Sequence, residues 1–170
     1  MSDFVCPEGA VLIPLRGKRG EGKFAIVDSD SFLLAKNYSW YLDAKGYVCA
    51  YRPKIEGRSK AVSLHRLVMG EPASSVDHIN MNPLDNRQSN LRICTNQLNQ
   101  GNTKLNIKNT TGYRGVSRFK RPRGLKIFRA DIRVFGKKIH LGRFATAEEA
   151  AKIYDAAARL HFGEFARTNF

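Results

Sequence analysis

Apolar and charged side chains alternate along residues 126–134, KIFRADIRV. Successive side chains of a strand point to opposite faces of a sheet, so this alternation predicts a strand with one apolar and one charged face. The charged face carries Arg129, Asp131 and Arg133.

The stretch that begins at Lys138, KIHLGRF, repeats this division and places Lys138 and His140 on the outer face. Residues 135–137, Phe-Gly-Lys, lie between the two stretches and can form the tight turn of a hairpin. The two strands are therefore expected to pair antiparallel.

A further strand is expected from Tyr113, in YRGVSRF. It adds Arg114 and Arg118 to the basic residues, and a bulge at Gly115 would shift the parity of the later residues in this strand. The three stretches predict an antiparallel sheet whose exposed face carries arginines.

A helix is expected after this sheet, in TAEEAAKIYDAAARLHFGEF. Thr146 followed by Glu149 fits a capping box, and Gly163 stands where a helix would end. Alanines recur at helical spacing, and a face of small residues lets a helix approach a sheet closely. The C-terminal part is thus predicted to be three strands backed by one helix.

Residues 76–102, VDHINMNPLDNRQSNLRICTNQLNQGN, contain seven asparagines, which are poor residues for helix or strand interiors. VDHIN and LRIC (91–94) alternate like short strands, residues 82–86 have turn composition, and Thr95 can cap a short helix. Besides building turns, amide oxygens, a carboxylate and an imidazole are groups that a catalytic divalent cation and an activated water require.

The N-terminal part contains four short strand-like stretches and one possible helix of one or two turns, at residues 28–37. Its aromatic residues, among them Tyr47, are expected in a core near a hairpin, with a nucleic-acid surface as the alternative. We expect an α+β protein with domains at 1–101 and 113–170, and a polar linker at 102–112.

Charge adds a partner to this picture. The 29 Lys and Arg residues against 15 Asp and Glu give a net charge of +14, and residues 105–143 hold 12 of the basic residues but one acidic residue. A basic excess concentrated in one segment favours a polyanionic partner. Lys54, Arg58, Lys60 and Arg66 are candidates to extend such a surface.

No apolar run approaches the roughly 20 residues that span a membrane, and the N-terminus does not have the composition of a signal peptide. We therefore expect no membrane association and a cytoplasmic location. The three cysteines form no CxxC pair and are expected to be reduced and buried.

Five segments of the C-terminal part, YRGV, FRADIR, LGRF, TAEEAAKIYDAAA and TNF, resemble the plant ethylene-response-factor (Apetala-two) DNA-binding domain in their order. The resemblance implies that the sheet docks in the major groove of DNA. Arg114, Arg133 and Lys138 then match contacts to bases or phosphates, and Asp131 matches an acidic contact. Ser117, Phe119 and His140 depart from the family pattern, so its DNA sequence preference does not carry over.

Residues 76–102, together with LHRLVMG at 64–70, resemble the HNH nucleases in their homing-endonuclease form, which have a ββα-metal motif. By this resemblance Asp77 is a metal ligand and His78 the general base. Asn90 orients that histidine, and Asn99, on the helix, is the other metal ligand. His65 is expected to pack or to form hydrogen bonds.

The two resemblances together imply a site-specific DNA endonuclease from a phage or another mobile element. One divalent cation, Mg²⁺ with Mn²⁺ as a possible substitute, and double-stranded DNA are the expected cofactor and partner. A monomer would nick one strand, whereas a homodimer would cut both. The alternatives are a non-catalytic, sequence-specific DNA-binding regulator, in which the nuclease-like unit is only a scaffold, and an RNA-binding protein.

Overall fold

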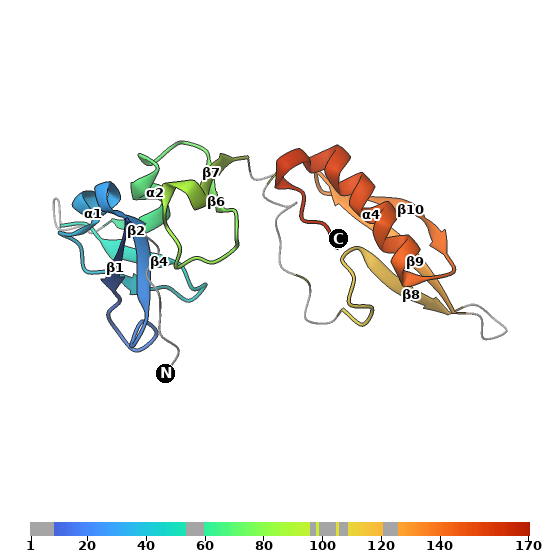
Figure 1. Cartoon of the computed structure of the whole chain (residues 1–170), viewed down its shortest axis with the longest axis horizontal. Helices are drawn as coiled ribbons and strands as arrows, with labels where there is room; N and C mark the ends of the chain where they lie inside the picture. Colours follow the sequence, from blue (N-terminus) through green and yellow to red (C-terminus); the bar gives the residue numbers. More distant parts are fainter. Residues whose placement is uncertain (1–8, 54–59, 96–97, 99–104, 106–108, 121–125) are drawn as a thin grey trace. The chain divides into compact units, whose positions relative to one another are not determined.

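The computed structural model describes residues 9–53, 60–95, 98, 105, 109–120 and 126–170 (Figure 1). The chain divides into two compact units, Met1–Cys94 and Thr95–Phe170. Of the region expected to be a linker, residues 102–104 and 106–108 lie outside the described residues, as does the basic turn at 121–125. None of the described helices is long and apolar enough to cross a membrane.

The first unit is built from short antiparallel pairs and two small helices. Its elements are β1 (Ala10–Pro14), β2 (Phe24–Asp28), α1 (Ser29–Ala35), β3 (Tyr41–Leu42), β4 (Val48–Tyr51), β5 (Ala61–Ser63), α2 (Leu64–Val68), β6 (Ser75–His78), the 3₁₀ turn η1 (Gln88–Asn90) and β7 (Leu91–Cys94). β1 pairs with β2, β3, β4 and β5 form a three-stranded sheet, and β6 pairs with β7.

One apolar core holds these pieces together. Trp40, Val27, Val48 and Leu64 are almost fully buried in it, and Val76 and Leu91 extend it to β6 and β7. The Trp40 indole donates a hydrogen bond to the carbonyl of Ala35, so its polar atom is satisfied inside the core. The core therefore places β6 and β7 against the rest of the unit.

The second unit is a sheet of the order β10-β9-β8 that packs on one helix. Its elements are β8 (Val116–Lys120), β9 (Lys126–Val134), β10 (Lys137–Phe144), α4 (Ala147–Phe162) and the 3₁₀ turn η3 (Gly163–Phe165). In Figure 1, α4 runs along the sheet, and its Ala150 and Ala151 are buried with Val116 and Ala130. The predicted α+β class and the C-terminal sheet with its helix are confirmed.

Local signals set the ends of these elements. Thr146 and Glu149 form the predicted capping box, and α4 ends at Gly163. The β9–β10 hairpin turns through Phe135 and Gly136, which both have positive φ as a type I′ turn requires. The third strand begins at Val116 rather than at Tyr113, because Gly115 has a φ of +70° and breaks the extended chain.

Gly115 provides a test of the packing between the sheet and the helix. A Cβ there would lie 2.0 Å from the Tyr154 ring, whereas one at Gly112, which also has positive φ, would meet nothing within 4 Å. Gly115→Ala is expected to destabilise the second unit by about 2 kcal/mol more than Gly112→Ala. Denaturant unfolding followed by far-ultraviolet circular dichroism measures this difference, and equal effects would contradict the packing described.

Candidate active site

His78 ends β6, is 5% exposed, and lies with Nε2 3.2 Å from Oδ1 of Asn86. The Asn86 amide is oriented by a second hydrogen bond, in which Nδ2 donates to the carbonyl of Pro83. An amide oxygen only accepts, so the neutral imidazole carries its proton on Nε2 and keeps Nδ1 as the acceptor. Asn86 therefore selects the tautomer of His78.

Electrostatics keep this imidazole neutral. Burial lowers the pKa of His78, while the Asn86 hydrogen bond and the negative charges of Asp77 and Asp85 offset part of that effect. The net direction is downward from the ordinary value near 6.5. A neutral histidine is the form that can accept a proton.

Asp77 precedes His78 on β6 and is 8% exposed. It pairs across the hairpin with Arg92 of β7, whose Nε and Nη2 lie 3.1 and 2.9 Å from Oδ2. Both side chains of this ion pair are largely buried. The carboxylate is therefore held in one orientation by an arginine that the sequence did not single out.

Asn90 fixes the loop between β6 and β7. Its amide oxygen accepts from the backbone of Asn80 at 3.0 Å, and its amide nitrogen donates to the side chain of Asn80 at 3.0 Å and to the carbonyl of Asp85 at 2.7 Å. The sequence resemblance gave Asn90 the role of orienting His78. That role stays a prediction. The His78 ring also forms a hydrogen bond with Asn86, which lies in the stretch 82–86 expected to be turn and loop.

The same loop is attached to β2. The amide of Ile26 donates to Leu84, and the amide of Asn86 donates back to Ile26. Asp85 is 3% exposed and accepts two hydrogen bonds from the Arg87 guanidinium, which, with other contacts, hold its pKa below the usual range. Asn86 is thus fixed by backbone and side chain together.

His65 and Tyr47 complete the surroundings of His78. The His65 ring meets the His78 ring edge-on, with centroids 5.1 Å apart, and the Tyr47 ring lies 5.4 and 6.1 Å from the two histidines. Tyr47 is 39% exposed, so the expectation that it is a core residue is wrong. His65 does pack, as expected, but its partners are the site residues.

The predicted metal ligands are divided by what the structure describes. Asp77 lies on β6 beside His78, whereas Asn99 lies outside the described residues. Leu98, next to it in the chain, is helical and donates its amide proton to Thr95 Oγ1, the expected cap. Among the described residues no three His, Cys, Asp or Glu side chains gather as a metal site.

In the second unit the structure gathers five of the predicted DNA contacts on one sheet face. Asp131 lies at the centre, 2.8 Å from Arg129 Nε, 3.2 Å from Lys138 Nζ and 3.1 Å from His140 Nδ1. Burial raises the pKa of Asp131, but these hydrogen bonds and charges outweigh it and lower the pKa overall. Arg133 pairs with Lys138 in the β9–β10 register and extends the face.

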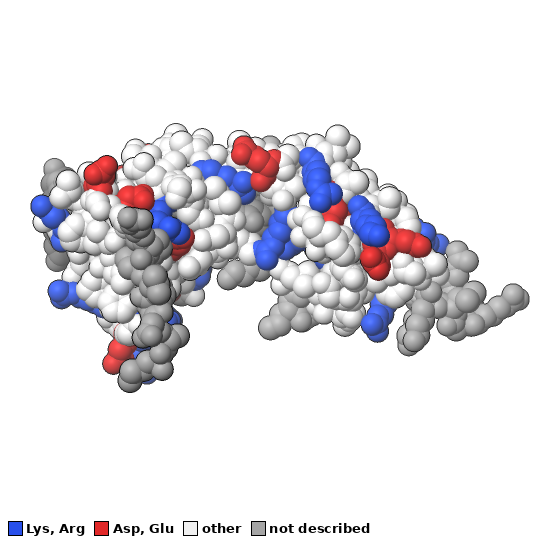
Figure 2. All heavy atoms as spheres, in the orientation of Figure 1, with Lys and Arg blue, Asp and Glu red and all other residues white. Residues whose placement is uncertain are grey.

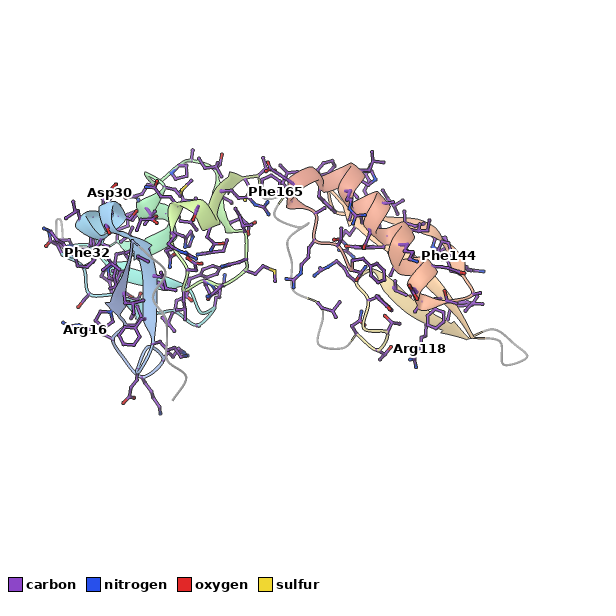
Figure 3. All side chains as sticks on the ribbon, viewed as in Figure 1. Arg16, Asp30, Phe32, Arg118, Phe144 and Phe165 are labelled. Atoms are coloured by element: carbon purple, nitrogen blue, oxygen red, sulfur yellow. The ribbon has the colours of Figure 1, made fainter. Side chains whose placement is uncertain are left out.

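Two predicted contacts lie elsewhere. Arg118 pairs with Phe128 and comes two positions after Val116, so it belongs to the face of β8 that looks toward α4 (labelled in Figure 3). Arg114 is 9% exposed and shares a side-chain hydrogen bond with Tyr154 of α4. The expectation that both join the exposed sheet face is corrected: Arg118 shares the face of Val116 by alternation within β8, and Arg114 lies before the strand begins.

Phe119 also lies on the sheet face, where the Arg143 guanidinium stands 4.9 Å from its ring centroid. On the side of the second unit that Figure 2 shows, blue Lys and Arg side chains lie between red Asp and Glu side chains, so this side has mixed charge. The basic residues are thus not spread evenly over this unit.

Fold and site together define a small two-unit α+β protein with a buried histidine and carboxylate on a short hairpin. Comparison with known proteins gives the class a name. A family model for HNH endonuclease matches residues 64–100. The chain is 34% identical over 174 residues to "Uncharacterized HNH endonuclease L560" of Acanthamoeba polyphaga mimivirus, and this alignment covers 98% of this chain and 85% of that protein.

A second relative is "Protein 3.8" of Escherichia phage T7, which is 34% identical over 92 residues. That alignment covers 54% of this chain and 73% of the phage protein. The chain belongs to the HNH endonuclease family.

The buried His65 gives a prediction about stability. Burial, helped by the charges of His78 and Arg66, lowers its pKa to about 4, and its Nδ1 has no hydrogen-bond partner in the described part of the chain. As pH falls below 6.5, His65 becomes protonated in the unfolded chain but stays neutral in the folded chain. Between about pH 7 and pH 4 the first unit should lose about 3 kcal/mol of stability to this residue.

Trp40, the single tryptophan of the chain, is 1% exposed in the first unit and reports its unfolding. His65→Gln should flatten the decline of stability with falling pH, while His161→Gln, in the other unit, should leave it unchanged. Denaturant titrations followed by Trp40 fluorescence measure both. A decline as steep in His65→Gln as in the parent chain would contradict the assignment.

Proposed function

We propose that the chain is a DNA endonuclease of the homing type, in which His78 takes the proton from the attacking water. The observation that carries this proposal is the hydrogen bond between His78 and Asn86. It leaves Nδ1 as the basic atom of a neutral imidazole, which is the state that general-base catalysis requires. The viral relatives support a source in a virus or mobile element.

Asp77 and Asn99 are proposed to hold one divalent cation, Mg²⁺ or Mn²⁺. Carboxylate and amide oxygens are hard ligands, and a site with two protein ligands leaves room for the waters that Mg²⁺ retains. This donor set fits Mg²⁺ better than zinc, which takes nitrogen and sulfur ligands. When bound, such a cation stabilises negative charge on the phosphate and on the leaving oxygen.

The chain's own residues prepare this chemistry before any substrate binds. Arg92 holds the Asp77 carboxylate through Oδ2, and the Asn86 amide holds the His78 ring. His65 and Tyr47 cover the ring from other sides and limit its rotation. Side chains fixed in this way lose little conformational freedom when the reaction begins.

The second unit is proposed to bind double-stranded DNA as the ethylene-response-factor-type domain does, with its sheet in the major groove. Asp131 orients Arg129, Lys138 and His140, and an oriented cation loses less entropy on contact with a base or phosphate. Arg133 adds a charge that no described acid pairs. Side chains oriented in this way can recognise base edges in the groove, whereas positive charge spread over a surface would contact only the phosphate backbone.

The nuclease proposal is tested in two steps. A duplex that the protein binds is first selected from a DNA pool in the presence of EDTA, and this duplex is then placed in a plasmid. The unmodified chain should relax or linearise supercoiled plasmid with Mg²⁺ and not with EDTA. His78→Ala should lower the rate by about 10² to 10⁴, and His161→Ala, on α4, should not change it. Full cutting by His78→Ala would disprove the assigned base, and no cutting of a bound plasmid by the parent would favour a DNA-binding regulator.

DNA binding by the sheet face is tested by comparing two arginines that lie on neighbouring strands but on opposite faces of the sheet. Arg133→Ala should weaken binding to the selected duplex by about 1 to 3 kcal/mol, whereas Arg118→Ala, on the other face, should cost less than half as much. Fluorescence anisotropy in EDTA measures both affinities, with structured RNA as competitor. Equal losses of affinity would show that the sheet does not bind DNA through the face that carries Asp131. Higher affinity for the RNA than for the duplex would disprove a DNA target.

A further inference from the structure

The turn between β1 and β2, residues 15–23, has the sequence LRGKRGEGK and combines glycines with cations. Arg16, Lys18, Arg19 and Lys23 are all exposed, and Glu21 is the one acid among them. None of the four cations forms an ion pair with any residue that the structure describes. This concentration of unpaired charge lies in the first unit, outside the basic segment 105–143.

The turn is nevertheless well fixed. Leu15 donates to the carbonyl of Lys23, and Arg16 donates to the carbonyl of Trp40 on the neighbouring segment. Inside the turn, Gly20 donates to Gly17 and Lys23 donates to Gly20. Figure 3 labels Arg16 where β1 runs into this turn.

Gly20 explains how the turn closes on itself. It is buried, and a Cβ at this position would lie 2.7 Å from the Arg16 carbonyl oxygen and 2.8 Å from Leu15 Cβ. The chain can fold back on itself here because glycine has no Cβ. The turn that carries the four cations therefore depends on a glycine at this position.

The turn faces the hairpin that reaches the active site. Lys18, Arg19, Glu21 and Lys23 line an open depression together with Leu42 of β3 and Asp43, Ala44 and Gly46 of the β3–β4 connection. Asp43 is occupied in that connection, because its Oδ1 accepts from the backbone of Lys45 and of Tyr47. Tyr47, the next residue after Gly46, lies against His65 and His78.

We propose that the β1–β2 turn is a second DNA-binding site, in which Lys18, Arg19 and Lys23 contact backbone phosphates of the duplex that His78 acts on. The inference rests on the proposed function for its ligand. The turn is preorganised, its cations form no ion pair with the described residues, and it adjoins the hairpin that leads to the catalytic histidine. Contacts of this kind position a duplex without reading its sequence.

The test compares two double variants of the full chain that remove the same charge. Lys18→Gln with Arg19→Gln removes two cations of the turn. Lys36→Gln with Lys152→Gln removes two exposed cations, after α1 and on α4, that do not line the depression. Binding to the selected duplex is measured in EDTA over a range of salt concentrations, and Trp40 fluorescence verifies that unfolding midpoints are unchanged.

Each phosphate contact contributes about 0.9 to the slope of log K against log salt, so the turn variant should lower the slope by about 1.8. The control pair should leave the slope unchanged, and Lys18→Arg with Arg19→Lys, which keeps both charges, should retain the slope of the unmodified chain. A slope that is unchanged in the turn variant, or equally lowered in the control, would overturn the proposal.

Plasmid cutting by the unmodified chain is scored separately. If the turn variant lowers the slope but the unmodified chain does not cut, the turn is a DNA-binding site and the nuclease proposal is wrong. If the unmodified chain cuts but the turn variant does not lower the slope, the nuclease proposal stands and the turn is not a DNA-binding site.

Discussion

The backbone of β2 holds the loop between β6 and β7, and the arrangement around His78 depends on this attachment. This loop of a dozen residues buries Asp85, Asn86 and Asn90, and each amide or carbonyl group left unpaired and buried costs about 1 to 3 kcal/mol. Ile26 supplies both an acceptor and a donor to Leu84 and Asn86, and Asn90 closes the loop from within. Asn86 is then completely buried, with its amide oxygen aimed at the imidazole. The tautomer of the histidine is thus a consequence of how a distant strand pairs.

The second unit solves a similar problem with a buried carboxylate. Asp155 of α4 is 1% exposed and accepts hydrogen bonds from the backbone and side chain of Asn169 and from the backbone of Phe170. Asn169 in turn accepts from the amide of Arg114. The C-terminal residues and the loop before β8 are therefore tied to the same helix residue. This network explains why Gly115 can approach Tyr154 so closely and why Arg114 lies inside rather than on the sheet face.

Much of this fold is determined by local patterns in the sequence. The strands β6, β7 and β9, the type I′ turn at Phe135 and Gly136, and the capping box of α4 are set by residues next to one another in the chain, so periodicity and turn chemistry predict them. The side-chain partners in the site cannot be predicted in this way. Asn86 looks like any asparagine of a turn, and only the pairing of β2 with its loop directs it to His78. Arg114 falls outside the sheet because one glycine breaks the extended chain just before β8 begins.

The two groups of cations differ in a way that bears on what each can contribute. Around Asp131, an arginine, a lysine and a histidine share one carboxylate, which lowers their net charge and fixes their directions. Such groups suit recognition, because geometry rather than charge discriminates among base edges. Within the described part of the chain, the cations of the β1–β2 turn have no such carboxylate partner, and their side chains are exposed to solvent. Unpaired cations attract any phosphate backbone and do so in a salt-dependent way. If both surfaces meet the same duplex, recognition and affinity come from different units of the chain, and a change in one need not disturb the other.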